Sequence, residues 1–526
     1  MDNGVGLVPE EEGSYLGAGQ QGPTDHEKVR RGHEGGPAIH QTHNATRWFP
    51  SRNHLLTVTG SMSPRINQRT RILLLALTLR VGLALSAWSL AQGSAEPFLA
   101  PDSDSYVDTA TSLATTGTFT HAGKPDIVRT PGYPLLLVPG VWLGGTVGWG
   151  IALQCVLNLV TILLVYDLAY RLGGQPAATT AALLLTFEPL TVIYSVKLLS
   201  ETCFATLLVA SLWGLVRGYL DDDPRRWAFG AACLGASALV RPIGYGLVLV
   251  FTVLALVFFT YRRFRPLQAR SILRASWLAT TMGLMLVPSA AWQARNLAVA
   301  DYRGLSAITD INLYFYQGAA VQARLQGRSF YEVQNELGYH DVGIFNDMRP
   351  DLAVLPQGPR LQRLGAEGAK TVAAHPLVYA GIHLRGVIRV LFDPGGVEVL
   401  RLLGAYPTTG GLLGRILDDG LLATGQHLVR ERPELIVVEG IFGLFLLALY
   451  VAAGRGALQL ARTRPILALV LVAAVLILLV AAGGPMSLSR FRHPVMPVLC
   501  LLAGLGWWRS MLSADSFSQV PAARQE

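Results

Sequence analysis

The chain has 526 residues, of which 51% are hydrophobic and only 15% are charged, and its formal net charge is +8. Soluble domains average about 25% charged residues, so a chain with so few charges cannot cover the surface of a globular protein of this length. The positive charge does not indicate nucleic-acid binding, because the arginines lie in short clusters between apolar runs, as in the cytoplasmic loops of membrane proteins. The composition therefore predicts an all-α polytopic integral membrane protein, with the lipid bilayer as a partner and no nucleic acid.

Residues 1–64 differ from the rest of the chain, being rich in Gly, Glu, Gln and His and having no sustained apolar period. Such a segment buries too little apolar surface to fold, so we expect a disordered cytoplasmic tail. Translation starting at Met62 is an alternative, because a short basic segment leads from this residue directly into the first apolar run. Residues 509–526 are expected to form a second cytoplasmic tail.

Ten apolar runs have the length that spans a bilayer. They lie at residues 72–91, 149–170, 176–194, 201–217, 227–243, 244–261, 275–292, 434–453, 466–483 and 494–508. Three arginines precede the first run, and every second connection after it is basic. By the positive-inside rule these connections and the amino terminus lie in the cytoplasm, so we predict a multi-pass membrane protein with a cytoplasmic amino terminus.

Two further apolar segments, residues 133–148 and 377–392, are less suited to spanning. The first contains two prolines and several glycines, and the second carries Arg385 and Arg389. We expect both to form interfacial or re-entrant helices, and the number of spans changes if either of them crosses the bilayer.

Two long insertions, at about residues 92–148 and 293–433, lie on the side opposite to the basic connections. They contain most of the acidic residues outside the amino-terminal tail, so function is expected there. The predicted domains are a transmembrane module of residues 65–292 that includes the first insertion, an external loop of residues 293–433 with interfacial helices, and carboxy-terminal transmembrane helices at residues 434–508.

Three carboxylates near the external membrane edge are candidates for chemistry. Asp102 and Asp104 follow the first span in the sequence Pro-Asp-Ser-Asp-Ser-Tyr, and Glu201 begins the fourth span. All three have a structural interpretation, as a helix cap or as acidic residues in a first helical turn. They also have a functional one, as a general base or a metal ligand held against the membrane surface.

Five arginines lie at the external ends of the spans, where the positive-inside rule does not place positive charge. They are Arg129, Arg241, Arg295, Arg490 and Arg492. Such arginines need partners, and a phosphate at the membrane surface would supply one. The alternative for Arg129 is a rigid proline turn with an arginine that snorkels to the interface. Arg80 lies within the first span and should face the bundle interior. Pairing with Asp167 and snorkelling to the interface are the two alternatives for it.

Eight short motifs occur in a fixed order between about residues 70 and 508. They are Asp102-Ser-Asp-Ser-Tyr106, Arg129-Thr-Pro-Gly-Tyr-Pro134, Leu198-Leu-Ser-Glu201-Thr, Val240-Arg241-Pro242, Trp292-Gln-Ala-Arg295-Asn296, Asn312-Leu-Tyr314, His375-Pro376 and Arg490-Phe-Arg492-His-Pro494. In this order they resemble the bacterial membrane glycosyltransferases of the GT-C type, nearest to the protein-mannosyltransferase-like group that includes the aminoarabinose transferases. The resemblance implies a GT-C fold and a location in a bacterial cytoplasmic (inner) membrane. It also implies transfer of a sugar, with inversion, from a polyprenyl-phosphate carrier to a glycan, lipid or protein acceptor at the external face.

The resemblance also implies roles for single residues. Asp102 matches the catalytic acid of the family, with Asp104 as its rival, because many relatives have two adjacent acids at this place whereas here a serine follows Asp102. Glu201 matches the second acid, and together with Asp104 it is the candidate for holding a divalent metal ion. Arg129 and Arg241 match positions that hold the carrier phosphate, and the other external arginines are expected to assist them.

These residue types suit the transfer independently of the resemblance. A phosphate leaving group is stable as an anion, so it needs cations or a metal ion but no general acid. The acceptor hydroxyl needs a base, which a carboxylate at the membrane edge supplies. Two alternatives use the same residues: a transporter or flippase of lipid-linked sugars, although no internal repeat of the transporter kind is visible, and a ligase that moves whole glycan chains.

Overall fold

The computed structural model describes residues 67–264, 275–406, 425–426, 428–430 and 432–507. The predicted tails at residues 1–64 and 509–526, together with Met62, lie outside the described residues. Gln68 and the described residues after it belong to one unit, which is almost entirely helical. Its single hairpin consists of the antiparallel strands β1 (Thr120–His121) and β2 (Lys124–Pro125). The predicted all-α fold class is therefore confirmed.

The helices run in the following order along the chain. They are α1 (Gln68–Leu90), η1 (Glu96–Phe98), α2 (Ser103–Thr116), α3 (Gly132–Trp142), α4 (Thr146–Phe187), α5 (Pro189–Tyr194), α6 (Glu201–Asp221), α7 (Pro224–Val240), α8 (Ile243–Phe264), α9 (Ala275–Ala300), α10 (Ile308–Ile311), the π-helix η3 (Asn312–Gly318), α11 (Ala319–Gln326), α12 (Phe330–Glu336), α13 (Val342–Met348), α14 (Pro350–Ala353), α15 (Gln357–Ala374), α16 (Pro376–Phe392), α17 (Gly396–Leu402), α20 (Pro433–Thr463), α21 (Pro465–Ala481), η4 (Ser489–Val495) and α22 (Met496–Trp507).

Nine of the ten predicted spans coincide with these helices apart from a few residues at their ends, whereas the predicted span at residues 176–194 is divided at Glu188 between α4 and α5. Four described helices, α1, α4, α6 and α20, are long and apolar enough to cross a membrane by themselves, and shorter apolar helices accompany them. Helix α4 covers the predicted span at residues 149–170 and most of the one at 176–194, and the two are separated at Gly174, where φ is 76° and the backbone is not helical. The protein is therefore a multi-pass membrane protein.

The corner between α4 and α5 supplies a hydrogen-bond acceptor for the buried Arg80. Glu188 ends α4 and caps α5, because its carboxylate accepts hydrogen bonds from the backbone of Leu190 and Thr191 at 3.2 and 2.6 Å. Arg80 of α1 is fully buried beside this corner and donates to the carbonyl oxygens of Ala76 and Thr186 at 3.0 and 3.3 Å. The Thr186 carbonyl lies in the last turn of α4, where helical carbonyls lack backbone partners.

The expected pairing of Arg80 with Asp167 is therefore wrong, and Arg80 does not snorkel. Asp167 instead forms an ion pair with Arg217 at 2.9 Å and accepts a hydrogen bond from the indole of Trp213 at 2.8 Å. Arg80 was placed correctly as a residue facing the bundle interior, but its partners are backbone atoms.

Helix α6 separates two groups of charged residues. Asp221, its last residue, forms ion pairs with Arg171, Arg217 and Arg226. Glu201 is its first residue. A helix of this length measures about 30 Å, which is the thickness of the hydrocarbon core of a bilayer. Arginines of two predicted basic connections thus meet at one end of α6, and Glu201 lies at the other.

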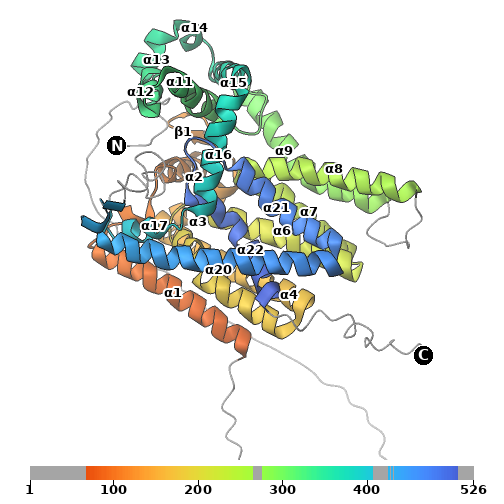
Figure 1. Ribbon diagram of the computed structural model, residues 1–526. Helices are drawn as coiled ribbons and strands as arrows, with labels where there is room; N and C mark the ends of the chain where they lie inside the picture. Colours follow the sequence, from red (N-terminus) through yellow and green to blue (C-terminus); the bar gives the residue numbers. More distant parts are fainter. Residues whose placement is uncertain (1–66, 265–274, 407–424, 427, 431, 508–526) are drawn as a thin grey trace, which may run out of the picture. The chain divides into compact units, whose positions relative to one another are not determined.

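The short helices α11 to α15 gather at the end of the bundle where α2 and β1 lie, and α16 runs from this group toward α17 (Figure 1). Helix α16 covers the predicted interfacial helix at residues 377–392. The predicted helix at residues 133–148 is wrong beyond Trp142, because Gly144, with φ of 69°, ends α3 in a turn and Thr146 begins α4.

Glycines allow close approach between α20 and α22, which pack extensively. A Cβ atom at Gly456 would overlap the carbonyl oxygen of Leu502, so Gly456→Val forces the two helices apart. We expect the free energy of unfolding to fall by about 1–3 kcal/mol, seen as a lower Tm in detergent. Gly454 on the same helix has no atom within 4 Å of its Cβ position, so Gly454→Val is the matched control. Equal Tm values for the two variants would contradict this packing.

Candidate functional site

Two carboxylates and three arginines meet at the Glu201 end of α6, and we call these five residues the site cluster. Asp102 forms ion pairs with Arg129 at 2.9 Å and with Arg490 at 3.0 Å, one at each carboxylate oxygen. Glu201 forms an ion pair with Arg241 at 2.6 Å, and the Nε atom of Arg490 lies 3.8 Å from the same Glu201 oxygen. Arg490 therefore links the two carboxylates, which come from helices 99 residues apart in the chain.

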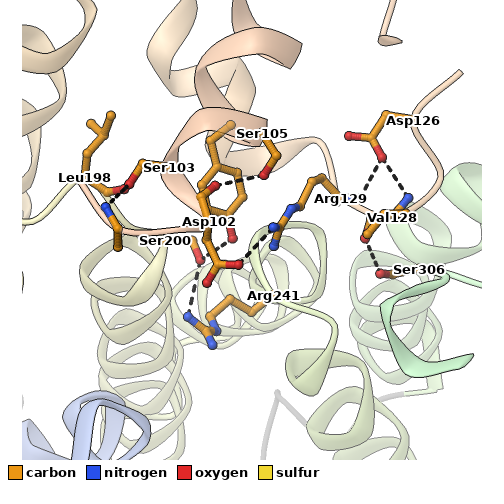
Figure 2. A network of polar contacts seen from close by, with 12 residues as sticks. Asp102, Ser103, Ser105, Asp126, Val128, Arg129, Leu198, Ser200, Arg241 and Ser306 are labelled. Carbon is orange, nitrogen blue, oxygen red and sulfur yellow. Dashed lines mark hydrogen bonds and ion pairs between the residues drawn. The ribbon is translucent and has the colours of Figure 1, made fainter. Parts of the chain in front are cut away.

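Asp102 occupies the residue before α2, but its side chain does not cap the helix. The hydroxyl of Ser103 fixes this point by accepting a hydrogen bond from Ala100 N at 2.9 Å and donating one to Leu198 O at 2.8 Å. The Asp102 carboxylate is thus free to turn toward Arg129, as Figure 2 shows. The Asp102 side chain therefore does not cap α2, as the structural interpretation expected, but pairs with arginines at the Glu201 end of α6.

The charge state of Asp102 follows from its surroundings. Burial raises the pKa of this carboxyl group, but Arg129 and Arg490 lower it by more, so the pKa lies well below its usual range. Burial likewise lowers the pKa of both guanidinium groups, and Asp102 more than offsets this. Asp102 is therefore an ionised carboxylate throughout the neutral pH range, with its basicity reduced by two cations.

Arg129 is aimed by a turn that Asp126 holds. One carboxylate oxygen of Asp126 accepts hydrogen bonds from Val128 N at 2.7 Å and Arg129 N at 2.9 Å, and the other accepts one from Thr109 at 3.1 Å. The guanidinium carbon of Arg129 lies 4.8 Å from the centre of the Tyr106 ring. The sequence analysis did not single out Asp126. A signal was present, because an Asp side chain often accepts hydrogen bonds from the backbone N–H groups two or three residues later in a turn.

Asp126→Ala removes the acceptor that shapes this turn, so we expect Arg129 to lose its orientation and any activity that depends on Arg129 to fall about tenfold. Asp126→Asn keeps an oxygen that accepts the two backbone hydrogen bonds, so it should restore most of the activity. The measurement is steady-state kinetics on the two purified variants. If Asp126→Asn is as impaired as Asp126→Ala, the charge of Asp126 matters and the turn is not its role.

Glu201 is held at the first turn of α6 and is only 1% exposed. Among the described residues no hydrogen bond reaches either of its carboxylate oxygens, so the charges of Arg241 and Arg490 balance it. Arg241 is directed to this place because it ends α7 in an extended conformation before Pro242. Its guanidinium also donates to the hydroxyl of Ser200 at 3.4 Å, which lies 3.1 Å from the Tyr106 hydroxyl.

Arg295 and Arg492, two of the predicted phosphate ligands, instead donate hydrogen bonds to backbone carbonyl oxygens outside the site cluster. Arg295 donates to the carbonyl oxygens of Asp126 and Phe119 at 2.6 and 2.8 Å. Arg492 is buried and donates to the carbonyl oxygens of Val390 and Leu391 at 2.6 and 3.1 Å. Both side chains satisfy backbone groups, so the structure does not bring them into the site cluster.

The predicted metal pair of Asp104 and Glu201 is not assembled either. Asp104 is exposed in the first turn of α2, where a negative charge favours the helix, and no described residue binds its side chain. Glu201 is buried. The part of the chain that the structure describes contains no group of three or more His, Cys, Asp or Glu residues that could hold a metal ion.

A central part of the chain is similar to a known protein family. Residues 128–292 match the family model described as dolichyl-phosphate-mannose-protein mannosyltransferase. These residues are similar to that family, and we call the matched segment the mannosyltransferase module. The match confirms, over these residues, the predicted resemblance to the protein-mannosyltransferase-like group of GT-C glycosyltransferases. The mannosyltransferase module includes Arg129, Glu201 and Arg241, whereas the fold brings Asp102 and Arg490 to it from outside.

Solved structures of two proteins are similar over most of the chain at low identity. Archaeal oligosaccharyltransferase AglB from Archaeoglobus fulgidus, in complex with an inhibitory peptide and a dolichol-phosphate, is 14% identical, with a TM-score of 0.37 over 86% of this chain and 52% of that chain. ArnT from Cupriavidus metallidurans bound to undecaprenyl phosphate is 18% identical, with a TM-score of 0.35 over 82% and 76%.

The chain spans about half the length of the oligosaccharyltransferase chains that it matches. TM-scores below 0.5 do not establish a shared site geometry, so the residue roles proposed below rest on the contacts within this chain. No curated protein sequence matches the chain significantly.

Proposed function

We propose that the protein is an inverting glycosyltransferase that moves a sugar from a polyprenyl-phosphate carrier to an acceptor hydroxyl at the external face of a bacterial cytoplasmic membrane. The observation that carries the proposal is the site cluster, in which two carboxylates and three arginines meet at one end of a membrane helix. The mannosyltransferase module supports it, because that family is described by a sugar donor linked to a polyprenyl-type phosphate.

The proposed reaction exchanges one bond for another at the anomeric carbon of the sugar. The bond from this carbon to the phosphate oxygen breaks, and the acceptor oxygen bonds to the carbon from the opposite face. The hydroxyl proton of the acceptor passes to Asp102, and the carrier leaves as polyprenyl phosphate. Arg129, Arg241 and Arg490 would neutralise the negative charge that develops on the phosphate, so no general acid is needed.

The ion pairs of Asp102 give donor binding a second consequence. In the free protein, Arg129 and Arg490 lower the pKa of Asp102 and so weaken it as a base. A donor phosphate competes for the same two guanidinium groups, because phosphate is a bidentate partner for arginine. Donor binding would therefore release Asp102 and make it a stronger base at the moment when the acceptor must be deprotonated.

Glu201 would keep Arg241 and Arg490 in position, because a buried carboxylate without its cationic partners is costly. A divalent metal ion does not fit this cluster, since its two carboxylates already face three guanidinium groups and the described residues offer no third ligand. No step of the proposed reaction uses a metal.

We further propose that the amino terminus is cytoplasmic, which puts the Asp221 end of α6 inside the cell.

The proposal is tested with purified protein in lipid vesicles that contain polyprenyl-phosphate-linked hexoses or pentoses, each donor in a separate reaction, together with an extract of cell-envelope lipids, glycans and proteins as acceptors. Mass spectrometry should detect polyprenyl phosphate released with one class of donor, and the transferred sugar should have the inverted configuration. Movement of an intact lipid-linked sugar between leaflets without cleavage would identify a flippase instead. A product that carries a whole glycan chain would identify a ligase.

A further inference from the structure

A cleft outside the site cluster contains two cations that have no partner among the described residues. It lies between the end of α9, strand β2 and the start of α15, has a volume of about 530 Å³ and is lined partly by Lys124 and Arg360. This volume is in the range of small-molecule sites. Neither side chain forms a hydrogen bond or ion pair with the described part of the chain. Burial lowers the pKa of the half-buried Arg360, and no carboxylate offsets this.

The walls of the cleft are fixed against each other. A Cβ atom at Gly358, the second residue of α15, would overlap the carbonyl oxygen of Ala300 at the end of α9, so only glycine permits this approach. The first turn of α15 contains Arg360 but no acidic residue. Asp301 is a carboxylate at the rim, and it is exposed and forms no ion pair with the described residues. The cleft therefore has a net excess of positive charge.

An apolar wall accompanies the two cations. Leu297 and Val299 of α9 line the cleft, and each is 45% exposed. They follow the predicted span at residues 275–292 within about 11 Å along the helix, which places the cleft at the membrane edge. Apolar side chains beside Lys and Arg at this level suit a lipid, with its acyl chain against the wall and its anionic headgroup on the cations.

The cleft is connected to the site cluster by a short, braced segment. Five residues lead from Lys124 to Arg129, so the two Cα atoms are at most about 18 Å apart. Arg295 of α9 holds this segment by donating to the carbonyl oxygens of Asp126 and Phe119. Arg129 pairs with Asp102 at 2.9 Å, so a glycolipid with its headgroup in the cleft would bring a hydroxyl to the site cluster when its glycan extends over a distance of this order.

We infer that this cleft binds the anionic headgroup of a lipid-borne acceptor and presents the acceptor hydroxyl to the site cluster. The inference rests on the proposed function for its catalytic meaning, but the binding itself is a separate property of Lys124 and Arg360. It assigns the acceptor to the lipid class, with a phosphate or carboxylate in its headgroup.

The test is a binding measurement on the full chain in nanodiscs of zwitterionic lipid. Dihexanoyl phosphatidic acid is titrated and its binding is followed by native mass spectrometry. The double variant Lys124→Gln with Arg360→Gln should weaken its affinity about tenfold or more. The matched control, Arg363→Gln with Lys370→Gln, removes two positive charges from exposed positions of α15, the helix that contains Arg360. It should bind like the wild type. Melting curves establish that both double variants are folded.

Equal weakening in the two double variants would overturn the inference, because it would reflect only the overall charge. Inorganic phosphate that binds as tightly as the lipid, with the same dependence on Lys124 and Arg360, would overturn the assignment to a lipid. Polyprenyl phosphate, titrated in parallel, should bind equally to the wild type and to the cleft variant. If the wild type binds phosphatidic acid but not polyprenyl phosphate, the proposed function fails while the cleft remains.

Discussion

Asp102→Asn should lower the rate of sugar transfer by about 10²–10⁴-fold, the range that a general base contributes. Asparagine keeps the shape of the side chain and an oxygen that accepts a hydrogen bond from Arg129, but it cannot take up the proton of the acceptor hydroxyl. The measurement is the initial rate of polyprenyl phosphate release at saturating donor, with the Tm of the variant as a check that it is folded.

Asp104→Asn is the matched control, because it makes the same chemical change two residues away. Asp104 is exposed on α2 and lies outside the site cluster, so this variant should keep a rate close to that of the wild type. If Asp104→Asn loses the activity and Asp102→Asn keeps it, the base is Asp104 and the ion pairs of Asp102 are structural.

Arg490→Gln should reduce kcat/KM about 10–100-fold and move the acid limb of its pH profile to higher pH. Arg490 is one of the two cations that lower the pKa of Asp102, so its removal raises that pKa. The carboxylate then takes up a proton at a higher pH, and activity is lost earlier as the pH falls. The size follows from a charge-assisted hydrogen bond, worth about 1.5–3 kcal/mol. The measurement is kcat/KM against pH for the purified enzyme.

Arg492→Gln separates this effect from general loss of structure. Arg492 donates to the carbonyl oxygens of Val390 and Leu391 at the end of α16, so its removal should lower the Tm. The acid limb of the pH profile should stay where it is in the wild type. An equal shift of the acid limb in both arginine variants would contradict the assignment of Arg490 to Asp102.

Much of the fold could be predicted because the length and composition of an apolar run predict a spanning helix. The partners of Arg80 could not, since they depend on how α1 packs against the end of α4, 106 residues later in the chain. The break between α4 and α5 at Glu188 could not be predicted either. There the apolar pattern continues through residues 176–194, while Pro189 interrupts the helix and Glu188 caps the next one.

The residues of the site cluster could be predicted as candidates, because charged side chains at the ends of apolar spans require polar partners. Their pairing was not predictable. Arg490 and Arg492 are equivalent in the sequence, but they lie in η4, which has about three residues per turn, so side chains two residues apart point in different directions. One reaches Asp102 and the other reaches α16.

The most direct test of the central claim is a structure of the protein with bound polyprenyl phosphate. We expect the phosphate to contact Arg129 and Arg490, and the ion pairs of these two residues with Asp102 to lengthen or break. Glu201 should keep its pairing with Arg241. A phosphate bound elsewhere, with Asp102 still paired to both arginines, would contradict the claim that the site cluster is where the carrier is recognised.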